Sequence, residues 1–398
     1  MSWKKKFVRN WGRLGMKCKL SDICGFRKGK VDVSNLTLKT YISTENMLPN
    51  KGGITVASSL PTAQLTQEYK KGDVLVSNIR PYFKKIWRAK NDGGCSNDVL
   101  VFQGNSNIDG DFLYYILAND DFFAYSMATS KGTKMPRGDK TSIMQYEVPV
   151  FDVDTQRKIA SVLRCLDEKI ELNFAINKNL AEQSQAIFAE FMCKYPYVLS
   201  PLGDMAEIID CLHSKKPKAV NDTTYQLLQL NNITDSGFLD LSSKYYISKS
   251  DYENWTRKCE IVEGDCVITN VGRIGAVSQA PNGTHAAMGR NMTCIRLRKD
   301  KPFYSYLITA LLSPHIRREI MKNTDEGTIM GALNVKNIPL LLFPMFAPPT
   351  MNALEDLLSP IRKAIEQNYL SNQTLSLLRD SLLPRLMSGE LDVSGIDL

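Results

Sequence analysis

The sequence is poor in the side chains that most enzymes use for proton transfer and metal binding. It has three histidines, His213, His285 and His315, and none lies beside a cysteine or carboxylate pattern typical of a nucleophile or metal site. The nine cysteines form no C-x-x-C pair. This usage favours reduced thiols in a cytoplasmic protein over a disulfide framework, and we expect no metal and no cofactor.

Motifs that bind nucleotides or cross membranes are also missing. Gly25–Lys30 is too short for a Walker loop and is not followed by Ser or Thr. Val271–Gly275 lacks the spacing of a dinucleotide fingerprint, and no Asn-Pro-Pro-aromatic methyl-transfer motif occurs. The longest apolar stretch, Ile338–Phe346, contains two prolines and is too short for a membrane span. We therefore expect a non-catalytic chain without membrane contact.

Positive charge is concentrated at the N-terminus. The net charge is +8, and residues 1–30 carry ten Lys or Arg against one acid, Asp22. Such a run can contact nucleic-acid phosphates or can be a solvated tail. The length of 398 residues and a hydrophobic content of 43% fit a globular chain of two or three domains.

The chain contains an internal repeat. Residues 131–135 read KGTKM, residues 326–330 read EGTIM, and a proline follows each at the same distance, Pro149 and Pro344. The same offset of 195 residues aligns Thr155–Met192 with Thr350–Met387 without gaps. A repeat of this length predicts two copies of one structural unit.

Both aligned segments carry a heptad seam, which predicts two long helices. The first seam is Ile159, Leu163, Leu166, Ile170, Asn173, Asn177 and Leu180; the second is Leu354, Leu358, Ile361, Ile365, Asn368, Asn372 and Leu375. Because asparagines occupy the same two steps in both, we expect the helices to pair with each other as an antiparallel coiled coil. The alternative is two separate helices, each lying on its own domain. Pro196 should end the first helix, and Pro360 predicts a kink or a new start near Ser359.

Upstream of each helix the repeat continues as a mixed module. Residues 72–80 and 264–273 share a Gly-Asp turn and a short β-branched strand that ends in hydroxyl, amide and guanidinium groups. We expect strands near 54–57, 73–77, 97–103, 227–230, 265–269 and 292–297, and short helices at 111–127 and 303–322. The fold class is therefore α+β, with two pseudo-repeated modules separated by the helix pair. The expected boundaries are 1–150, 151–195, 196–346 and 347–398.

Loops of the two modules carry the candidate binding residues. Arg and Asn side chains can read base edges, and Lys and Ser commonly hold phosphates. The candidates are Ser77, Asn78, Arg80, Tyr82, Lys84, Lys85, Lys131, Lys134 and Arg137 in the first module, and Thr269, Asn270 and Arg273 in the second. Taken singly, each is equally consistent with an ordinary solvated loop. We expect them to contact duplex DNA.

This organisation resembles the specificity subunit of Type I restriction–modification systems over about Leu20 to Leu391. Leu382–Leu391, LLPRLMSGEL, is similar to that family's C-terminal signature, and Pro149 followed by Gln156 and Arg157 resembles its entry into the central helix. The second copy departs from the pattern, because Thr350–Ala353 lacks the Gln-Arg pair.

The resemblance implies two target recognition domains that each read half of a bipartite DNA target. It also implies that the helices dock methyltransferase subunits, two of them, which bind S-adenosylmethionine, and through them restriction endonuclease subunits. Two other interpretations stay open. One is a half-site reader of a methylation-only or Type IIB-like system, and the other is a duplicated non-catalytic interaction scaffold without DNA binding.

Overall fold

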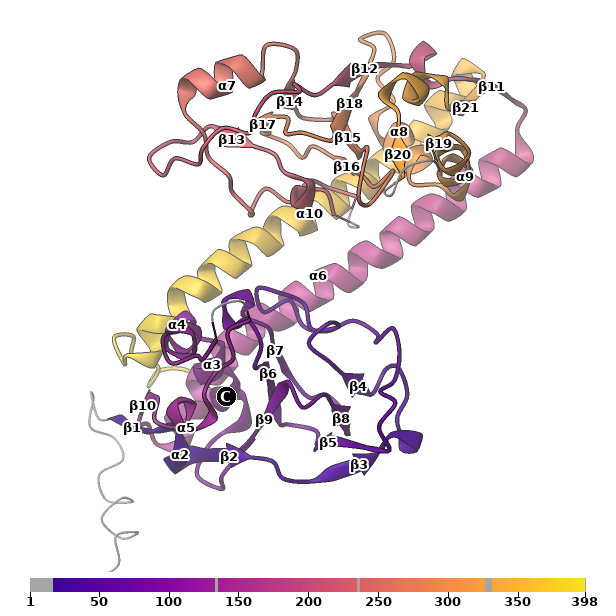
Figure 1. Ribbon diagram of the computed structural model, residues 1–398. Coiled ribbons are helices and arrows are strands. Elements are labelled where there is room, and N and C mark those ends of the chain that lie inside the picture. The colour runs from indigo at the N-terminus through magenta and orange to yellow at the C-terminus, as the bar shows by residue number, and fades with distance from the viewer. Residues whose placement is uncertain (1–16, 133–134, 235–236, 326–330, 398) are drawn as a thin grey trace, which may run out of the picture. The chain divides into compact units, whose positions relative to one another are not determined.

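The computed structural model describes residues 17–132, 135–234, 237–325 and 331–397 (Figure 1). The chain divides into two compact units: unit 1 comprises Met1–Lys169 with Leu375–Leu398, and unit 2 comprises Ile170–Thr374. Two long helices, α6 (Val153–Lys194) and α10 (Pro348–Met387), contribute to both units.

Unit 1 contains two four-stranded sheets and a two-stranded ribbon. The first sheet has the order β2 (Cys24–Phe26), β9 (Val99–Gly104), β6 (Val74–Ser77), β7 (Ile86–Arg88). The second has the order β3 (Lys30–Asp32), β5 (Leu65–Tyr69), β8 (Gly93–Cys95), β4 (Tyr41–Ile42). The ribbon pairs β1 (Lys17–Lys19) with β10 (Glu147–Pro149). All pairs are antiparallel except β4 with β8, which is parallel.

The first sheet of unit 1 is buried on both faces, which explains the continuous apolar run of β6. Because side chains alternate along a strand, Val74 and Val76 point to one face and Leu75 to the other. Val74 and Val76 join a core with α6 and the short helices, whereas Leu75 packs with Tyr69 and Trp87 toward the second sheet. The short helices are α2 (Leu20–Ile23), α3 (Gly110–Ala118), α4 (Asp120–Ala128) and α5 (Lys140–Ile143).

Unit 2 repeats this plan. Its four-stranded sheet has the order β12 (Ala206–Asp210), β18 (Met292–Leu297), β15 (Cys266–Thr269), β16 (Val277–Gln279). Its three-stranded sheet has the order β13 (Gln226–Leu227), β17 (His285–Ala287), β14 (Glu260–Val262), with β13 and β17 parallel. Two ribbons pair β11 (Tyr197–Pro201) with β21 (Leu342–Phe346), and β19 (Thr324–Asp325) with β20 (Ala332–Leu333).

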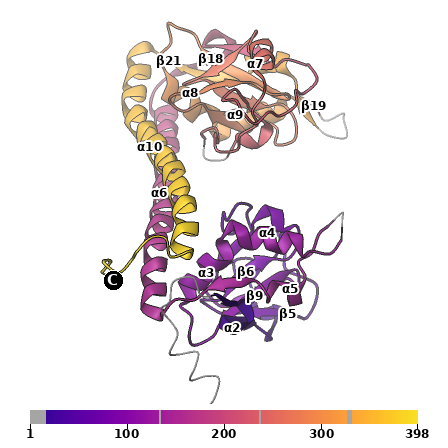
Figure 2. The same ribbon diagram turned by 90° about the vertical axis from the view of Figure 1, so that its left-hand side faces the viewer.

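The helices of unit 2 besides the long pair are α7 (Lys249–Trp255), α8 (Tyr304–Leu311) and α9 (Pro314–Lys322). Cys266 and Ile268 of β15 face the core that contains α8, and Val267 faces the other sheet. This is the same alternation as in β6. Each unit thus holds a sheet between a helical layer and a second sheet, as Figure 2 shows for each in turn.

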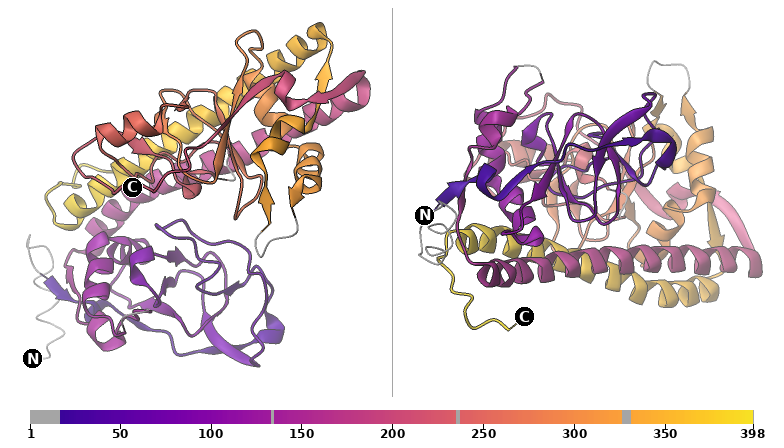
Figure 3. Two further views of the ribbon diagram at one scale, coloured as in Figure 1. Left: turned by 45° about the horizontal axis from the view of Figure 1, so that its top comes forward. Right: turned by 90° about the horizontal axis from the view of Figure 1, so that it is seen from below.

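The two long helices run antiparallel (Figure 3, right). In unit 2, Asn173 Nδ2 donates to Asn372 Oδ1 at 2.8 Å, and Asn368 Nδ2 donates to Asn177 Oδ1 at 2.8 Å. The internal repeat aligns Asn173 with Asn368 and Asn177 with Asn372. The two hydrogen bonds are therefore equivalent, with the roles of the two helices interchanged. Every predicted seam residue is buried or half-buried. The predicted α+β class with repeated domains and an antiparallel helix pair is confirmed.

Several local expectations were wrong. The strand expected at 227–230 is β13 at Gln226–Leu227, and a 3-10 turn begins at Leu230. No strand spans 54–57, where Ile54 makes one isolated bridge to Met47. The predicted helix at 111–127 is two helices, because Asn119 adopts an extended backbone and caps α4. The one at 303–322 divides in the same way at Ser313, which caps α9 ahead of Pro314.

Pro360 does not restart a helix, since α10 continues through it. Proline removes the N–H that would bond the carbonyl of Asp356. Both residues lie on the exposed face of α10, where water can bond that carbonyl. The linear domain boundaries stay a prediction. None of the helices in the described ranges is both long and apolar enough to cross a membrane.

Candidate nucleic-acid interface

The connection from β6 to β7 forms a tight, exposed tip in unit 1. Arg80 adopts a left-handed backbone with φ of 51° and precedes a 3-10 turn at Pro81–Phe83, whose first residue is the proline that favours such a start. Tyr82 and Phe83 are 48% and 38% exposed, and their ring centroids lie 4.6 Å apart. Exposed aromatic rings next to cations suit stacking and phosphate contacts on nucleic acid.

The structure brings the two predicted segments of unit 1 together. Ile79 forms an antiparallel bridge with Arg137, and the Arg80 N–H donates to the Pro136 carbonyl at 2.9 Å. The Gly138 N–H donates to the Asn78 carbonyl at 3.2 Å. Residues 77–85, 131–132 and 135–138 therefore form one surface. Thr133 and Lys134 of the first Gly-Thr-x-Met repeat lie outside the described residues, as do residues 326–330, which contain the second repeat, and residues 1–16 of the basic tail.

Three cations of this surface already have carboxylate partners within unit 1. Lys84 Nζ lies 2.7 Å from Asp120, Lys131 Nζ 2.6 Å from Asp139, and an Arg137 Nη 3.1 Å from Asp98. The hydrogen bond from Lys131 lowers the pKa of Asp139 to about 2. DNA phosphates would have to exchange with these carboxylates, so the net electrostatic gain per cation is smaller than for an unpaired lysine.

Two residues of the predicted set are held more firmly. Ser77 is buried and its hydroxyl donates to the Ile79 carbonyl at 3.1 Å. Lys85 Nζ donates to the Thr44 carbonyl at 2.6 Å and lies 5.7 Å from the centroid of the Phe83 ring. Burial lowers the pKa of Lys85. Both side chains support the tip in this structure.

Beside this surface opens a polar cleft of about 430 Å³, the first cleft. It lies where the parallel strands β4 and β8 end. Its lining is Tyr41, Ser43, Thr44, Glu45, Asn46, Thr55, Val56, Ala57, Ser58, Ser59, Leu60, Pro61, Ser96 and Asp98. Buried Asn46 shapes it, because its Oδ1 accepts the Ser43 N–H at 2.6 Å and its Nδ2 donates to the Thr55 carbonyl at 2.9 Å.

In unit 2, two of the three predicted residues serve the fold. Buried Thr269 donates its hydroxyl proton to the Arg273 carbonyl. Buried Asn270 donates to the Leu333 carbonyl at 3.1 Å and accepts from the Thr293 hydroxyl at 3.0 Å. Arg273 is exposed, with one Nη 3.0 Å from the Ile233 carbonyl. Of the three, Arg273 alone presents its side chain at the surface.

Unit 2 opens a cleft of about 390 Å³, the second cleft, at the corresponding place. It lies where the parallel strands β13 and β17 end, and its lining is Lys216, Leu227, Gln229, Leu230, Asn231, Trp255, Arg290 and Asn291. Buried Asn232 plays the part of Asn46: its Oδ1 accepts the Gln229 N–H at 2.6 Å and its Nδ2 donates to the Asp240 carbonyl at 2.5 Å. The repeat therefore extends to the clefts.

Arg290 and Asn291 were missed from the sequence. Both are exposed, and Asn291 has a φ of 63°. The Asn291 carbonyl accepts the Asn270 N–H at 2.9 Å, as the Asp98 carbonyl accepts the Asn78 N–H at 2.8 Å. These matching bonds pair Asn291 with Asp98. A Gly-Arg-Asn turn between two strands was the available signal, since Arg and Asn are the side chains that bind guanine and adenine bidentately.

Two groups of potential metal ligands occur among the described residues, Asp210 with Cys211 and His213, and Cys259 with Asp265 and Cys294. In the second group Asp265 is occupied, because Arg296 Nε and Nη2 donate to its two oxygens at 2.8 and 2.5 Å. The guanidinium would repel a cation there. In the first group His213 is exposed, at 2.8 Å from Asp210.

The geometry defines a class of protein with duplicated α+β domains, each with a polar cleft and each with residues of α6 and α10 in its core. Residues 15–182 match the family model of the Type I restriction modification DNA specificity domain. The resemblance to Type I specificity subunits seen in the sequence is confirmed.

Known relatives agree with this assignment. The chain is 30% identical over 185 residues to the Type I restriction enzyme HindI specificity subunit of Haemophilus influenzae, covering 44% of this chain and 40% of that protein. It is 20% identical over 399 residues to the MjaIX specificity subunit of Methanocaldococcus jannaschii, covering 92% and 88%. The fold is similar to the Type I restriction–modification S subunit from M. genitalium, with a TM-score of 0.55, 13% identity and coverage of 94% and 97%. The match to the Haemophilus protein thus spans less than half of its length.

Proposed function

We propose that this chain is the non-catalytic DNA-recognition subunit of a Type I restriction–modification complex, in which each domain reads one half of a bipartite target. The observation that carries the proposal is the duplicated cleft. Both clefts lie at the ends of a parallel strand pair and are shaped by an equivalent asparagine, yet their linings differ. A conserved framework with unlike linings suits two different half-sites.

The partners follow from the same proposal. Double-stranded DNA contacts the clefts and the basic tip around Arg80, where phosphate contacts fix position and base contacts specify sequence. The helix pair docks two methyltransferase subunits, which bind S-adenosylmethionine, and restriction subunits join through them. The chain itself needs no cofactor in this arrangement.

The test is reconstitution with a cognate methyltransferase subunit, followed by sequencing of the modified positions. We expect one interrupted sequence to be methylated, and the Arg290→Ala variant to lose discrimination in one half only. A complex that methylates DNA without a bipartite consensus would contradict the proposal. Binding of the subunits without any effect on DNA would favour a scaffold.

A further inference from the structure

Unit 2 contains another hollow besides the second cleft, and none of the candidate DNA-binding residues lines it. This pocket, the helix pocket, has a volume of about 580 Å³, within the range of about 300–1,000 Å³ typical of ligand sites. Residues of α6, α8 and α10 line it: Phe174, Asn177, Lys178, Ala181, Glu182, Ser184, Gln185, Ile308, Thr309, Leu312, Arg362, Ile365 and Tyr369. Apolar side chains make up much of the wall.

Arg362 supplies a cation to the helix pocket. Its Nε donates to Gln279 Oε1 at 2.9 Å, its Nη2 donates to the Gly237 carbonyl at 2.6 Å, and its Cζ lies 3.4 Å from the centroid of the Phe238 ring. These partners are all neutral, and within the described ranges Arg362 makes no ion pair, although the carboxylate of Glu366, one turn further along α10, favours its charge. Burial lowers its pKa to about 9, so it remains charged at neutral pH. A buried cation without a counter-ion is unfavourable unless an anion joins it.

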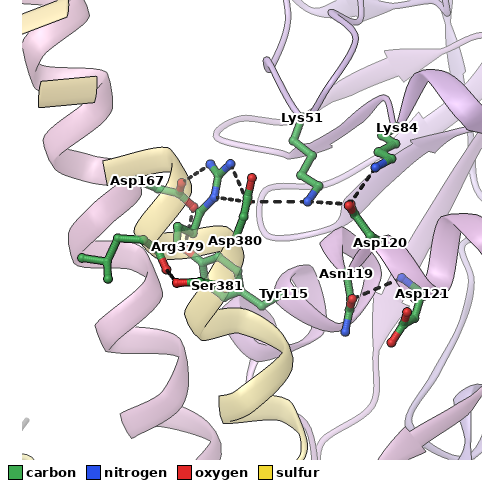
Figure 4. A network of polar contacts seen from close by, with 11 residues as sticks. Lys51, Lys84, Tyr115, Asn119, Asp120, Asp121, Asp167, Arg379, Asp380 and Ser381 are labelled. Carbon is green, nitrogen blue, oxygen red and sulfur yellow. Dashed lines mark hydrogen bonds and ion pairs between the residues drawn. The ribbon is translucent and has the colours of Figure 1, made fainter. Parts of the chain in front are cut away.

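The equivalent place in unit 1 is filled (Figure 4). Tyr115 donates its hydroxyl proton to Asp167 Oδ2 at 2.8 Å, and Arg379 Nη1 donates to Asp167 Oδ1 at 2.8 Å. Asp380 lies on the other side of Arg379, 2.9 Å away, and 3.8 Å from Lys51. A phenol ring and two carboxylates therefore enclose this guanidinium.

The repeat shows what unit 2 has lost. The offset of 195 residues aligns Asp167 with Arg362 and Arg379 with Ser184. Thr309 is the sixth residue of α8, as Tyr115 is the sixth of α3. Where unit 1 has tyrosine, aspartate and arginine, unit 2 has threonine, arginine and serine. The exchange opens a volume and leaves Arg362 without an ion pair among the described residues, with Glu366 acting on it only through a longer-range attraction.

We propose that the helix pocket binds a carboxylate carried on an apolar or aromatic body, supplied by an acidic segment of a partner protein. The phenol and the carboxylate that Tyr115 and Asp167 supply in unit 1 would then come from outside the chain. A protein is the occupant because the exposed part of the lining includes two large apolar side chains, Phe174 at 58% and Leu312 at 43%, beside the Lys178–Glu182 ion pair. A small molecule held within the pocket would leave those apolar side chains in water. The choice of partner rests on the function proposed above. The ligand chemistry rests only on the helix pocket and Arg362.

The chemistry is tested with 3-(4-hydroxyphenyl)propionate, which joins a phenol to a carboxylate, and with its amide as the matched neutral probe. Binding to the full chain is measured by calorimetry or ligand-observed NMR. We expect the propionate to bind at least about tenfold more tightly than the amide, equivalent to about 1.4 kcal/mol. Equal binding, or no saturable binding at millimolar concentration, would overturn the proposal.

Two variants locate the probe. Arg362→Gln removes the charge and should weaken propionate binding about tenfold while leaving amide binding unchanged. Because Arg362 also anchors Gly237, Ala181→Trp is the second variant: Ala181 is an exposed α6 residue that lines the pocket and does not hold Arg362. Ala186→Trp, exposed on α6 outside the lining, is its control. If Ala181→Trp binds the propionate as the control does, the helix pocket is not the site.

The partner is tested by competition. Purified methyltransferase subunit should displace the propionate, and Ala181→Trp should weaken the complex of the two proteins about tenfold relative to Ala186→Trp. A probe that binds but is not displaced would overturn the protein occupant. The probe titration needs no DNA, so a failure of sequence-specific recognition would contradict the proposed function without affecting this result.

Discussion

The first and second clefts share a framework and differ in chemistry. The first cleft presents hydroxyls and carboxylates, with Glu45 and Asp98 in its lining, whereas the second presents Lys216, Arg290 and amides beside Trp255. Carboxylates accept hydrogen bonds from cytosine amino groups, and arginine donates to guanine. Since the backbone around Asn46 and Asn232 is equivalent, the difference lies in side chains that the fold does not require. A recognition domain can thus change its target while its stability depends on other residues.

The residues that hold the framework should give the largest effects. Asp73 and Asp265 are the aspartates of the repeated Gly-Asp turn. Each has a buried carboxylate that pairs with an arginine, Arg27 in unit 1 and Arg296 in unit 2. Removing one partner of a buried pair lowers the free energy of unfolding by roughly 3–5 kcal/mol. Because Arg296 is partly exposed, we expect Asp265→Ala to lower it by about 3 kcal/mol. Denaturant unfolding of the full chain measures it. Asp240→Ala is the control, because Asp240 is half-buried and has no ion pair among the described residues. It should lower the free energy of unfolding by less. An equal loss in both variants would contradict a special role of the Asp265–Arg296 pair in stability.

The helix pair should respond at an intermediate level. Asn372→Ala leaves Asn173 buried without its partner, which costs about 1–3 kcal/mol of unfolding free energy. Replacing both asparagines with leucine removes the unsatisfied groups and should be nearly neutral or stabilising. Because asparagine at a seam fixes register, the double variant should also lose the uniqueness of the pairing. Thermal unfolding and the dispersion of NMR signals report the two effects, and a double variant as unstable as the single one would contradict them.

Removing Arg290 should affect binding without affecting stability. Arg290→Ala should cost about 1–3 kcal/mol of DNA affinity and relax one base position, because a lost bidentate contact has that magnitude. Asn97→Ala is the matched change in unit 1. Asn97 is exposed and precedes Asp98, as Arg290 precedes Asn291, the residue equivalent to Asp98. We expect it to act on the other half-site. Competition binding with single-base variants of the target measures both, and relaxation in the same half-site would contradict the assignment of one domain to each half.

The sequence predicted the framework better than the sites. The sequence predicted strand β6, its repeat β15 and the helix seams because burial places apolar residues at characteristic spacings. A helix seam repeats every four and three residues, and the side chains of a strand alternate between two faces. Thr269 and Asn270 were misleading, since a hydroxyl or amide after a strand can hydrogen-bond the backbone of the neighbouring loop as readily as it can bind a ligand. The clefts were not predictable, because they join residues such as Gln229 and Arg290 that meet only through the parallel pairing of β13 and β17. The helix pocket needed both the repeat and the geometry, since Ser184 and Arg362 carry no motif.

The smallest effect concerns the paired cations of the unit 1 tip. Lys131 is 82% exposed at its side chain and bonds Asp139, so its removal should leave unfolding unchanged within error. If Lys131 leaves Asp139 for a phosphate in the complex, Lys131→Ala should reduce the slope of log affinity against log salt by about one. Lys39, exposed in unit 1 and outside both the tip and the first cleft, is the control, and Lys39→Ala should leave the slope unchanged. Asp139→Asn should do the opposite of Lys131→Ala and raise affinity at low salt, because it frees the lysine. An unchanged slope in Lys131→Ala would mean that the pair stays closed on DNA and that the tip is held in position by other contacts.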